Sequence, residues 1–279
     1  MDLGGIENTA KYPGPGDEAT VAARRPFPYI TPTSYDDSTG YSNYNALQIL
    51  LNGRAGRGLT YLISYAWSKS IDLACSGDYG VEGCELQDAY NPRADRSVSG
   101  FDLTHMFSGS FNYELPFGKG KSFNPHNRAL SYLAEGWQLN GIVTLHSGTP
   151  YGVIYQGDLA NTGNTFVRAN LVGNPTPDHR TAAEWINTSV FAIPSPYTFG
   201  DLGRNSLRSD WFRNVDCSLF RRFPISDQVQ LELRAEAFNA LNSVVFAAPG
   251  KVINGPNFGV VTSTANTPRQ LQVALKLAF

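Results

Sequence analysis

The sequence lacks the features that mark several large classes of protein. Its 279 residues carry 22 Lys and Arg against 24 Asp and Glu, a formal net charge of −2. Because the sequence shows neither a basic excess nor a basic face, we expect no nucleic-acid partner. The longest uninterrupted apolar run, residues 244–249, is far shorter than the ~20 residues that a membrane-spanning helix needs. Any membrane role must therefore depend on β-strands.

Motifs for catalysis and metal binding are also missing. The four histidines are scattered, and neither a zinc-ligand spacing nor a Gly-x-Ser-x-Gly motif is present. His105 and His146 could in principle form an acyl-transfer pair with a serine, but nothing in the sequence brings a base to a nucleophile. We therefore predict a protein that is not an enzyme and that uses no cofactor or metal ion.

What the chain does contain is a repeated alternation of apolar and polar residues. The last nine residues, 271–279, are apolar at every odd position and polar or small at every even one. Because successive side chains of a strand point to opposite faces, this segment has one apolar face and one polar face. The same pattern recurs along the chain. The predicted strands cover residues 43–53, 58–70, 101–115, 135–148, 211–224, 228–241 and 267–279.

The connections between these strands alternate in length. Those at 54–57 and 225–227 are tight and the one at 116–134 is intermediate, whereas 71–100, 149–210 and 242–266 are long. Short turns on one side and long loops on the other are typical of outer-membrane β-barrels, whose apolar face contacts lipid. The predicted fold class is therefore all-β, an antiparallel transmembrane β-barrel segment of about seven or eight strands. Either an eighth strand comes from residues 22–36, or the sheet needs further strands to close.

The expected strand number and the start of the chain both indicate a partial barrel. Single-chain bacterial barrels have even strand counts, and open sheet edges in lipid leave backbone groups unpaired. Residues 1–5 have no features of a signal peptide, which an exported barrel needs. We therefore expect the C-terminal portion of a longer protein or a truncated reading frame. Residues 1–40 are predicted to form an irregular N-terminal segment, and residues 41–279 the barrel segment.

Aromatic residues near the ends of the predicted strands are candidates for a membrane girdle. Tyr113 and Trp137 flank the intermediate turn, and Trp67 lies near the other end of its strand. Amphipathic rings prefer the depth of the lipid headgroups. The alternative is that these rings pack in a soluble core, which would need a second sheet to cover them.

The three cysteines allow one local disulfide. Cys75 and Cys84 lie nine residues apart in one loop, and a bridge between them fits an oxidising compartment. Free thiols at both positions remain the alternative. Cys217 lies alone in a predicted strand, where we expect it to act as a small apolar residue that faces lipid.

Two groups of charged residues have a structural and a functional interpretation. Acidic residues crowd the 71–100 loop and could bind a cation or ligand, but a solvated loop is the simpler expectation. They are Asp72, Asp78, Glu82, Glu85, Asp88 and Asp95. A second group lies on the polar face of the last two strands, where cross-strand ion pairs are expected and contact with a substrate is the alternative. Its members are Glu232, Arg234, Glu236 and Lys276.

Several residue blocks, taken in order, resemble one known family. They are YNALQ at 44–48, SYAWSKS at 64–70, YELPFGKGK at 113–121, GWQLNG at 136–141, GRNSLR at 203–208 and RAEAFN at 234–239. With the terminal Leu-x-Leu-x-Phe pattern, they resemble the C-terminal barrel segment of TonB-dependent outer-membrane receptors. The resemblance is to the Oar-like group, which carries a carboxypeptidase-regulatory-like N-terminal domain, and it covers about residues 25–279.

The resemblance implies a 22-stranded barrel with an N-terminal plug and a TonB box. Neither the plug nor the TonB box is in these 279 residues. TonB would therefore act only through a missing N-terminal region. The resemblance also implies that Leu275, Leu277 and Phe279 form the C-terminal signal for the β-barrel assembly machinery. The other expected partners are outer-membrane lipid and an unknown ligand.

The function predicted from the sequence is the wall of a substrate-uptake channel in the outer membrane of a Gram-negative bacterium. The loops at 71–100 and 149–210 would lie outside the cell and capture the ligand. One alternative is a structural or adhesive surface barrel without transport. Another is a soluble β-sandwich that binds carbohydrate through its aromatic residues.

Overall fold

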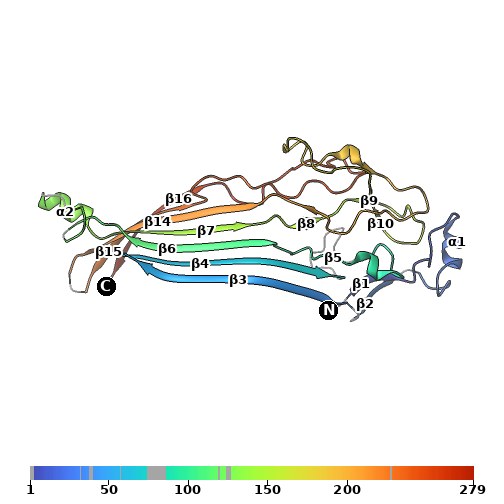
Figure 1. The fold of residues 1–279 in the computed structure, drawn as a ribbon, viewed down its shortest axis with the longest axis horizontal. Helices are drawn as coiled ribbons and strands as arrows, with labels where there is room; N and C mark the ends of the chain where they lie inside the picture. Colours follow the sequence, from blue (N-terminus) through green and yellow to red (C-terminus); the bar gives the residue numbers. More distant parts are fainter. Residues whose placement is uncertain are drawn as a thin grey trace.

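A computed structural model describes residues 3–31, 33–37, 40–56, 58–73, 86–118, 120–123, 127–226 and 228–279. The largest element is an antiparallel sheet whose strands follow the order β16-β15-β14-β7-β6-β4-β3 (Figure 1). Its strands are β3 (Ser42–Ala55), β4 (Leu59–Asp72), β6 (His105–Glu114), β7 (Trp137–His146), β14 (Phe212–Pro224), β15 (Gln230–Phe238) and β16 (Gln270–Ala278). All seven predicted strands are therefore confirmed, and each pairs with its neighbour in the sequence.

Shorter elements lie outside this path. The short strands are β1 (Leu3–Glu7), β2 (Thr33–Asp37), β5 (Ser97–Val98), β8 (Pro150–Tyr151), β9 (Ile154–Gln156), β10 (Phe166–Arg168), β11 (Asn170–Leu171), β12 (Phe191–Ala192) and β13 (Leu207–Arg208). The helices are α1 (Glu18–Ala23), α2 (Arg128–Ala134), and the 3₁₀ turns η1 (Pro92–Asp95) and η2 (Thr188–Val190). None of the helices in the described ranges is long and apolar enough to cross a membrane.

The N-terminal 40 residues do not add an eighth long strand to the sheet. Strand β1 pairs with β2 in a separate two-stranded sheet, and α1 lies between them in the sequence. The expectation that residues 22–36 supply a barrel strand is therefore wrong. The large sheet ends at β3 on one side and β16 on the other. These two strands do not pair, so the sheet is not closed.

The pairing register places the apolar positions of all seven strands on the same face. Residues directly opposite each other in an antiparallel pair share a face. In the middle of the sheet, one row of opposed residues runs across five strands: Leu51, Ile63, Gly109, Val143 and Val215. At the other side, Leu233 on β15 faces Leu275 on β16. We call this side of the sheet the apolar face and the opposite side the polar face.

Large rings lie across glycines on the apolar face. A Cβ atom added at Gly141 would lie 2.3 Å from Cε1 of Phe111, and one added at Gly53 would lie 2.7 Å from the hydroxyl oxygen of Tyr61. Each ring lies on the strand next to its glycine. Cross-strand contacts of this kind hold the register of a sheet and give its surface an even height. The apolar face is therefore built partly from rings that lie over neighbouring backbone.

No second layer of the described chain covers the apolar face. The side chains of Leu47, Trp67 and Leu275 are 55%, 56% and 68% exposed. The buried hydrophobic cluster of the molecule is formed instead by residues of the long connections. A β-sandwich would bury this face against another sheet, and the described residues contain no such sheet. The predicted transmembrane fold is consistent with this exposure, because lipid contacts apolar side chains without a protein layer.

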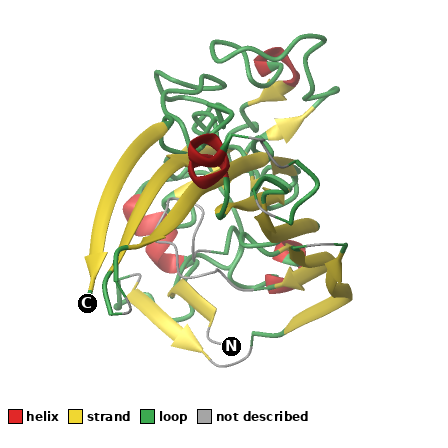
Figure 2. Ribbon diagram, turned by 90° about the vertical axis from the view of Figure 1, so that its left-hand side faces the viewer, coloured by secondary structure: helices red, strands yellow, loops and turns green. Residues whose placement is uncertain are grey.

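The two ends of the sheet differ. The long connections gather at one end, whereas the short turns, α2 and the C-terminus lie at the other (Figure 1). Seen along the strands, the sheet is curved (Figure 2). The alternation of loop lengths predicted from the sequence is therefore confirmed. It divides the molecule into a loop end and a turn end.

The first prediction compares adjacent residues that lie on opposite faces. Ile63 lies on the apolar face halfway along β4, and Leu62 lies on the polar face. In lipid bilayers, Ile63→Arg should lower the unfolding free energy by about 2–4 kcal/mol, the cost of an arginine that faces lipid near the midplane. Leu62→Arg should cost much less, because its side chain points to the aqueous side. Urea unfolding from vesicles measures both, and equal losses would contradict the assignment of the faces.

Candidate functional site

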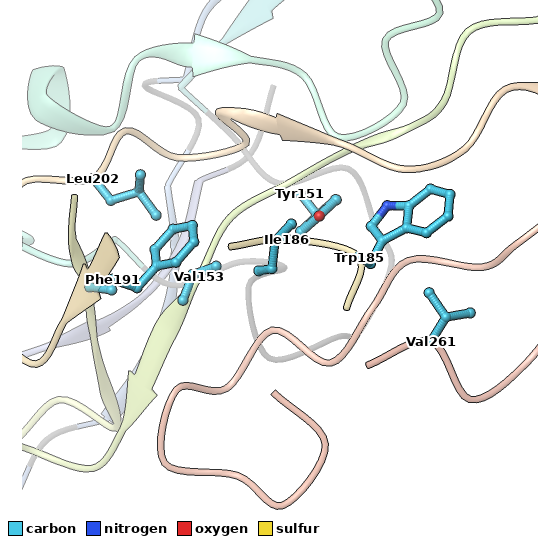
Figure 3. Close-up of a cluster of buried hydrophobic side chains, with 8 residues drawn as sticks. Tyr151, Val153, Trp185, Ile186, Phe191, Leu202 and Val261 are labelled. Atoms are coloured by element: carbon cyan, nitrogen blue, oxygen red, sulfur yellow. The ribbon is translucent and has the colours of Figure 1, made fainter. Parts of the chain in front are cut away.

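The long connections form a packed unit with its own hydrophobic core at the loop end. Its buried residues come mainly from 149–210, and one comes from 242–266: Tyr151, Val153, Ala169, Trp185, Ile186, Phe191, Leu202 and Val261 (Figure 3). Two edge-to-face ring pairs join these connections, because Trp185 packs against Phe246 and Phe191 packs against Phe258. The 149–210 connection and part of the 242–266 connection therefore form one folded body, which we call the loop body.

The N-terminal segment is part of this folded body. The backbone N–H of Ala10 donates to the carbonyl of Thr162 at 2.7 Å, and Nη2 of Arg24 donates to the carbonyl of Asn161 at 2.8 Å. Asp17 caps α1 by accepting from the backbone N–H of Thr20, and this bond lowers the pKa of the Asp17 carboxyl. Residues 8–31 therefore pack against part of the 149–210 connection.

Three Asp–Arg pairs with buried aspartates fasten the 149–210 connection to the strand ends. Asp72, Asp95 and Asp102 are only 0–2% exposed and lie in or beside the 71–102 stretch. Each pairs with an arginine from the later connection. The pairs are Asp72 with Arg204, Asp95 with Arg168, and Asp102 with Arg208. Because each pair joins segments about 70 or more residues apart, the three together fix how the loop body sits on the sheet.

Arg204 is the centre of this arrangement. Besides the carboxylate of Asp72, its guanidinium donates to the backbone carbonyl of Asp72 at 3.0 Å and to that of Asp95 at 2.9 Å. The next residue, Asn205, has a positive φ of 54° and donates to the carbonyl of Val98 at 2.9 Å. Asparagine tolerates this backbone conformation better than most residues. The residue types of this segment are therefore explained by its tight contact with the 71–102 stretch.

Asp102 explains why β6 begins later than predicted. Its carboxylate accepts from the backbone N–H of Ser70 at 2.6 Å and from Thr104 Oγ1 at 3.0 Å, and it also pairs with Arg208. These bonds hold residues 101–104 in a turn, so the strand begins only at His105. Arg208 also donates to the carbonyl of Gly148, which joins the same point to the end of β7.

In the pair between Asp95 and Arg168, the arginine side chain is 8% exposed, the least of the three arginines. Burial raises the pKa of the Asp95 carboxyl, although Arg168 and Arg204 oppose the rise. Burial therefore acts against the charged form of this carboxyl, and the two arginines act in its favour. Gln87 completes the site, because its backbone N–H donates to Asp95 and its side-chain oxygen accepts from the backbone N–H of Arg168. Such a pair favours one arrangement of the loops over others.

These contacts correct the expectation for the acidic residues. Asp72 and Asp95 are neither solvated nor arranged as a cation site, because arginines neutralise both. Asp88 accepts from the backbone N–H of Tyr90 in a local turn. Asp78, Glu82 and Glu85 lie outside the described residues. Elsewhere in the described part of the chain, no group of three or more His, Cys, Asp or Glu could hold a metal ion.

On the polar face, the described residues form ion pairs near the turn end, but none of these pairs joins the last two strands as expected. Glu232 pairs across strands with Arg222 at 2.8 Å and along its own strand with Arg234 at 2.8 Å. Glu236 also contacts Arg234, at 3.5 Å, and accepts from Gln272 at 2.9 Å. Lys276 lies opposite Glu232 in the register, but within the described residues it makes no ion pair.

The three predicted girdle residues lie at the two ends of the apolar face. Trp67 lies towards the loop end of β4, opposite His105, and Tyr113 lies at the turn end of β6. Trp137 begins β7 at the turn end, and its indole N–H donates to the carbonyl of Leu133 in α2 at 2.9 Å. Membrane depth at these residues stays a prediction.

An aromatic stack that sequence reasoning missed lies near Trp67. The ring of His105 stacks between Tyr65 and Trp211, with centroid distances of 6.3 and 5.9 Å. The Tyr65 hydroxyl also hydrogen-bonds Nδ1 of His105 at 2.8 Å. This stack explains why the polar residue His105 occupies a position on the apolar face. Trp211 could have been found from its place at the predicted start of a strand.

At the turn end, Arg221 is a second polar exception on the apolar face. Its guanidinium lies over the ring of Phe223, 4.1 Å from the centroid, and over Tyr132 of α2 at 5.1 Å. It also donates to the carbonyl of Leu133 at 2.6 Å. Because α2 and these rings cover the charge, Arg221 is only 3% exposed. The sequence offered no signal for this cover.

The remaining site residues can be placed only in part. Cys75 and Cys84, and so the predicted disulfide, lie outside the described residues. Cys217 is a free cysteine on the apolar face between Gly141 and Ala237. In the proposed assembly signal, Leu275 and Leu277 lie on the apolar face of the edge strand β16, and the side chain of Phe279 is 96% exposed just beyond it. The signal itself stays a prediction.

The second prediction tests the fastening of the loop body. Arg204→Ala leaves the carboxylate of Asp72 buried without its partner, which should destabilise the loop body by about 3–5 kcal/mol. Arg213→Ala is the matched control, because it removes an Arg–Asp pair of the same region whose arginine is 51% exposed. That change should cost less than about 1 kcal/mol. Native-state proteolysis of residues 149–210 measures both, and similar cleavage rates would contradict the role of Arg204.

Comparison with known proteins gives one match. The model of a family described as "Outer membrane beta barrel domain" matches residues 3–272. A search of curated proteins and a search of solved structures found no match. The matched stretch includes six of the seven long strands, the first three residues of β16 and the loop body.

Proposed function

Because the chain belongs to the family of outer membrane beta barrel domains and lies in the outer membrane, we propose that it forms the wall of a substrate-uptake channel. In this proposal the loop end faces the outside of the cell, and the folded loop body captures the ligand. The channel is of the TonB-dependent receptor type. The ligand passes along the polar face of the sheet.

The observation that carries the proposal is the construction of the loop end. A purely structural barrel needs only short loops, yet residues 149–210 form most of a hydrophobic core and are fastened by three ion pairs to buried aspartates. Holding a large loop body in one arrangement costs conformational entropy, and binding sites on loops require such rigidity. The arrangement supports recognition of a ligand at the outer end of a channel.

The residue blocks that resemble TonB-dependent receptors support the finer assignment. The block at 203–208 contains both Arg204 and Arg208, which fasten the loop body. The block at 136–141 contains Trp137 and Gly141, which contact α2 and the ring of Phe111. The blocks therefore coincide with positions where the fold restricts the choice of residue.

The proposed partners follow from the surfaces. Lipid would contact the apolar face, and the β-barrel assembly machinery would bind the C-terminal strand with Leu275, Leu277 and Phe279. TonB would couple the channel to the inner membrane. We also propose that the protein has no enzymatic activity. A structural or adhesive barrel is the competing function. The observation that favours this alternative is the presence of exposed apolar residues on the loop body, such as Val172, which is 71% exposed and could contact another cell surface.

The third prediction separates transport from adhesion. The gene product, taken from the outer membrane of its own bacterium, should be retained by an immobilised periplasmic domain of TonB, because an energised receptor must contact TonB physically. An unrelated barrel from the same membrane is the control and should pass through. If the gene product also passes through, the transport proposal fails and the structural or adhesive function replaces it.

A further inference from the structure

We propose that the apolar face binds the phosphate group of an anionic membrane lipid at its loop end, through Lys69 and Arg213. This site deepens the lipid contact of the proposed function and rests on it. Lys69 lies near the end of β4 and Arg213 lies near the start of β14, and both positions are at the loop end. In the register, Lys69 shares its face with Trp67, and Arg213 lies directly opposite Leu145. Both cations therefore lie on the side of the sheet that contacts lipid.

The apolar face carries basic groups and no acidic ones. Within the seven long strands, it holds no aspartate or glutamate. Its Lys, Arg and His residues are Lys69, His105, Arg213 and Arg221. The polar face carries both signs, as in the pair of Glu232 with Arg222. Because basic groups alone attract anions, the partner that fits the apolar face is anionic.

These basic groups lie at the two ends of the apolar face, and the middle of the face has none. On β14, Arg213 and Arg221 are eight residues apart, which is about 26 Å of extended strand. A tilted strand of that length crosses most of the apolar band of a β-barrel, which is about 25 Å high. Arg221 is covered by α2, so the basic groups that a lipid headgroup can reach are those at the loop end.

Both cations have donors that the protein does not use. Lys69 is exposed, and within the described ranges no carboxylate pairs with it. Arg213 is 51% exposed, and its Nη2 atom donates to Asp210 at 3.1 Å and to the carbonyl of Val244 at 3.4 Å. Its Nε and Nη1 atoms make no hydrogen bond to any described residue. The planar guanidinium can therefore present these two nitrogen atoms to a phosphate.

Asp210 neutralises Arg213 only in part. Its carboxylate also accepts from the backbone N–H of Trp211 at 2.8 Å and from that of Phe246 at 3.3 Å. Hydrogen bonds to backbone donors share the negative charge that would otherwise act on the guanidinium alone. An exposed pair of this kind is also weakened by water, so a second anion can approach Arg213 from the lipid side.

Exposed indole rings beside the cations favour a lipid over a soluble anion or an acidic protein. Trp67 is 56% exposed and lies two residues before Lys69, and Trp211 is 47% exposed and lies two residues before Arg213. Trp211 also stacks on His105 of the apolar face. Indole rings prefer the depth of lipid headgroups, and basic side chains reach the same depth on their apolar stems. A lipid can therefore cover the rings with its acyl chains while its phosphate contacts the cations.

The fourth prediction uses the full chain in detergent with dioleoylphosphatidic acid as the probe. Lys69→Gln with Arg213→Gln should weaken its binding about thirtyfold, because each basic residue near a membrane surface contributes about a factor of five to binding an anionic lipid. The matched control is Arg54→Gln with Lys276→Gln, which removes two exposed cations from the polar face and should leave the affinity unchanged. Mass spectrometry of the intact protein–lipid complexes measures the affinities, and heat-modifiable migration in gels confirms that each variant is folded.

A second variant guards against indirect effects. Lys69→Arg with Arg213→Lys keeps both charges and should keep the binding. Equal losses in the two glutamine pairs, or a loss in this charge-preserving pair as large as in Lys69→Gln with Arg213→Gln, would overturn the proposal. Binding of dioleoylglycerol, which has no phosphate, as tightly as the probe would overturn it too. Displacement of the probe by an equal concentration of inorganic phosphate would replace the lipid site with a site for a free anion. Because these measurements need no TonB, they can fail while the uptake function stands.

Discussion

The whole structure depends on an apolar sheet face that the described chain leaves uncovered. Every strand of the sheet contributes apolar side chains to that face, and the register keeps them together. Exposing such a surface to water would be unfavourable in free energy, whereas exposing it to hydrocarbon is not. In hydrocarbon the remaining requirement is that the backbone N–H and C=O groups are hydrogen-bonded. Pairing is complete in the interior of the sheet, and only β3 and β16 have a free side. The lipid therefore replaces the second layer that a soluble sheet would need.

The loop body follows different physical rules from the sheet. It buries Trp185, Phe191 and their neighbours against one another, as a soluble domain does. Its buried Asp–Arg pairs add little net stability, since the cost of desolvation offsets the Coulomb attraction. Their contribution is specificity, because each guanidinium fits one carboxylate from a distant part of the chain. The result is a packed loop body at one end of a sheet whose stability depends on the membrane.

Individual elements show how far sequence reasoning reached. Alternation found all seven long strands, because the side-chain period of a strand is visible in the sequence itself. The start of β6 was placed four residues early, since the turn made by Asp102 depends on bonds to Ser70 and Arg208 from distant strands. Asp72 and Asp95 were expected to be solvated, because their arginine partners lie more than 70 residues away and no local pattern indicates them. The stack of His105 between Tyr65 and Trp211 was hidden for the same reason.

The sequence by itself determined the two-faced strands, their order and the asymmetry of their connections, because these depend on side-chain period and on chain distance alone. Only the tertiary structure decided which loop residues pack together, which aspartate meets which arginine, and which rings stack on His105. These features arise when segments far apart in the chain are brought to the same place. Contact between such segments is set by the register of the whole sheet, and no short stretch of residues encodes it.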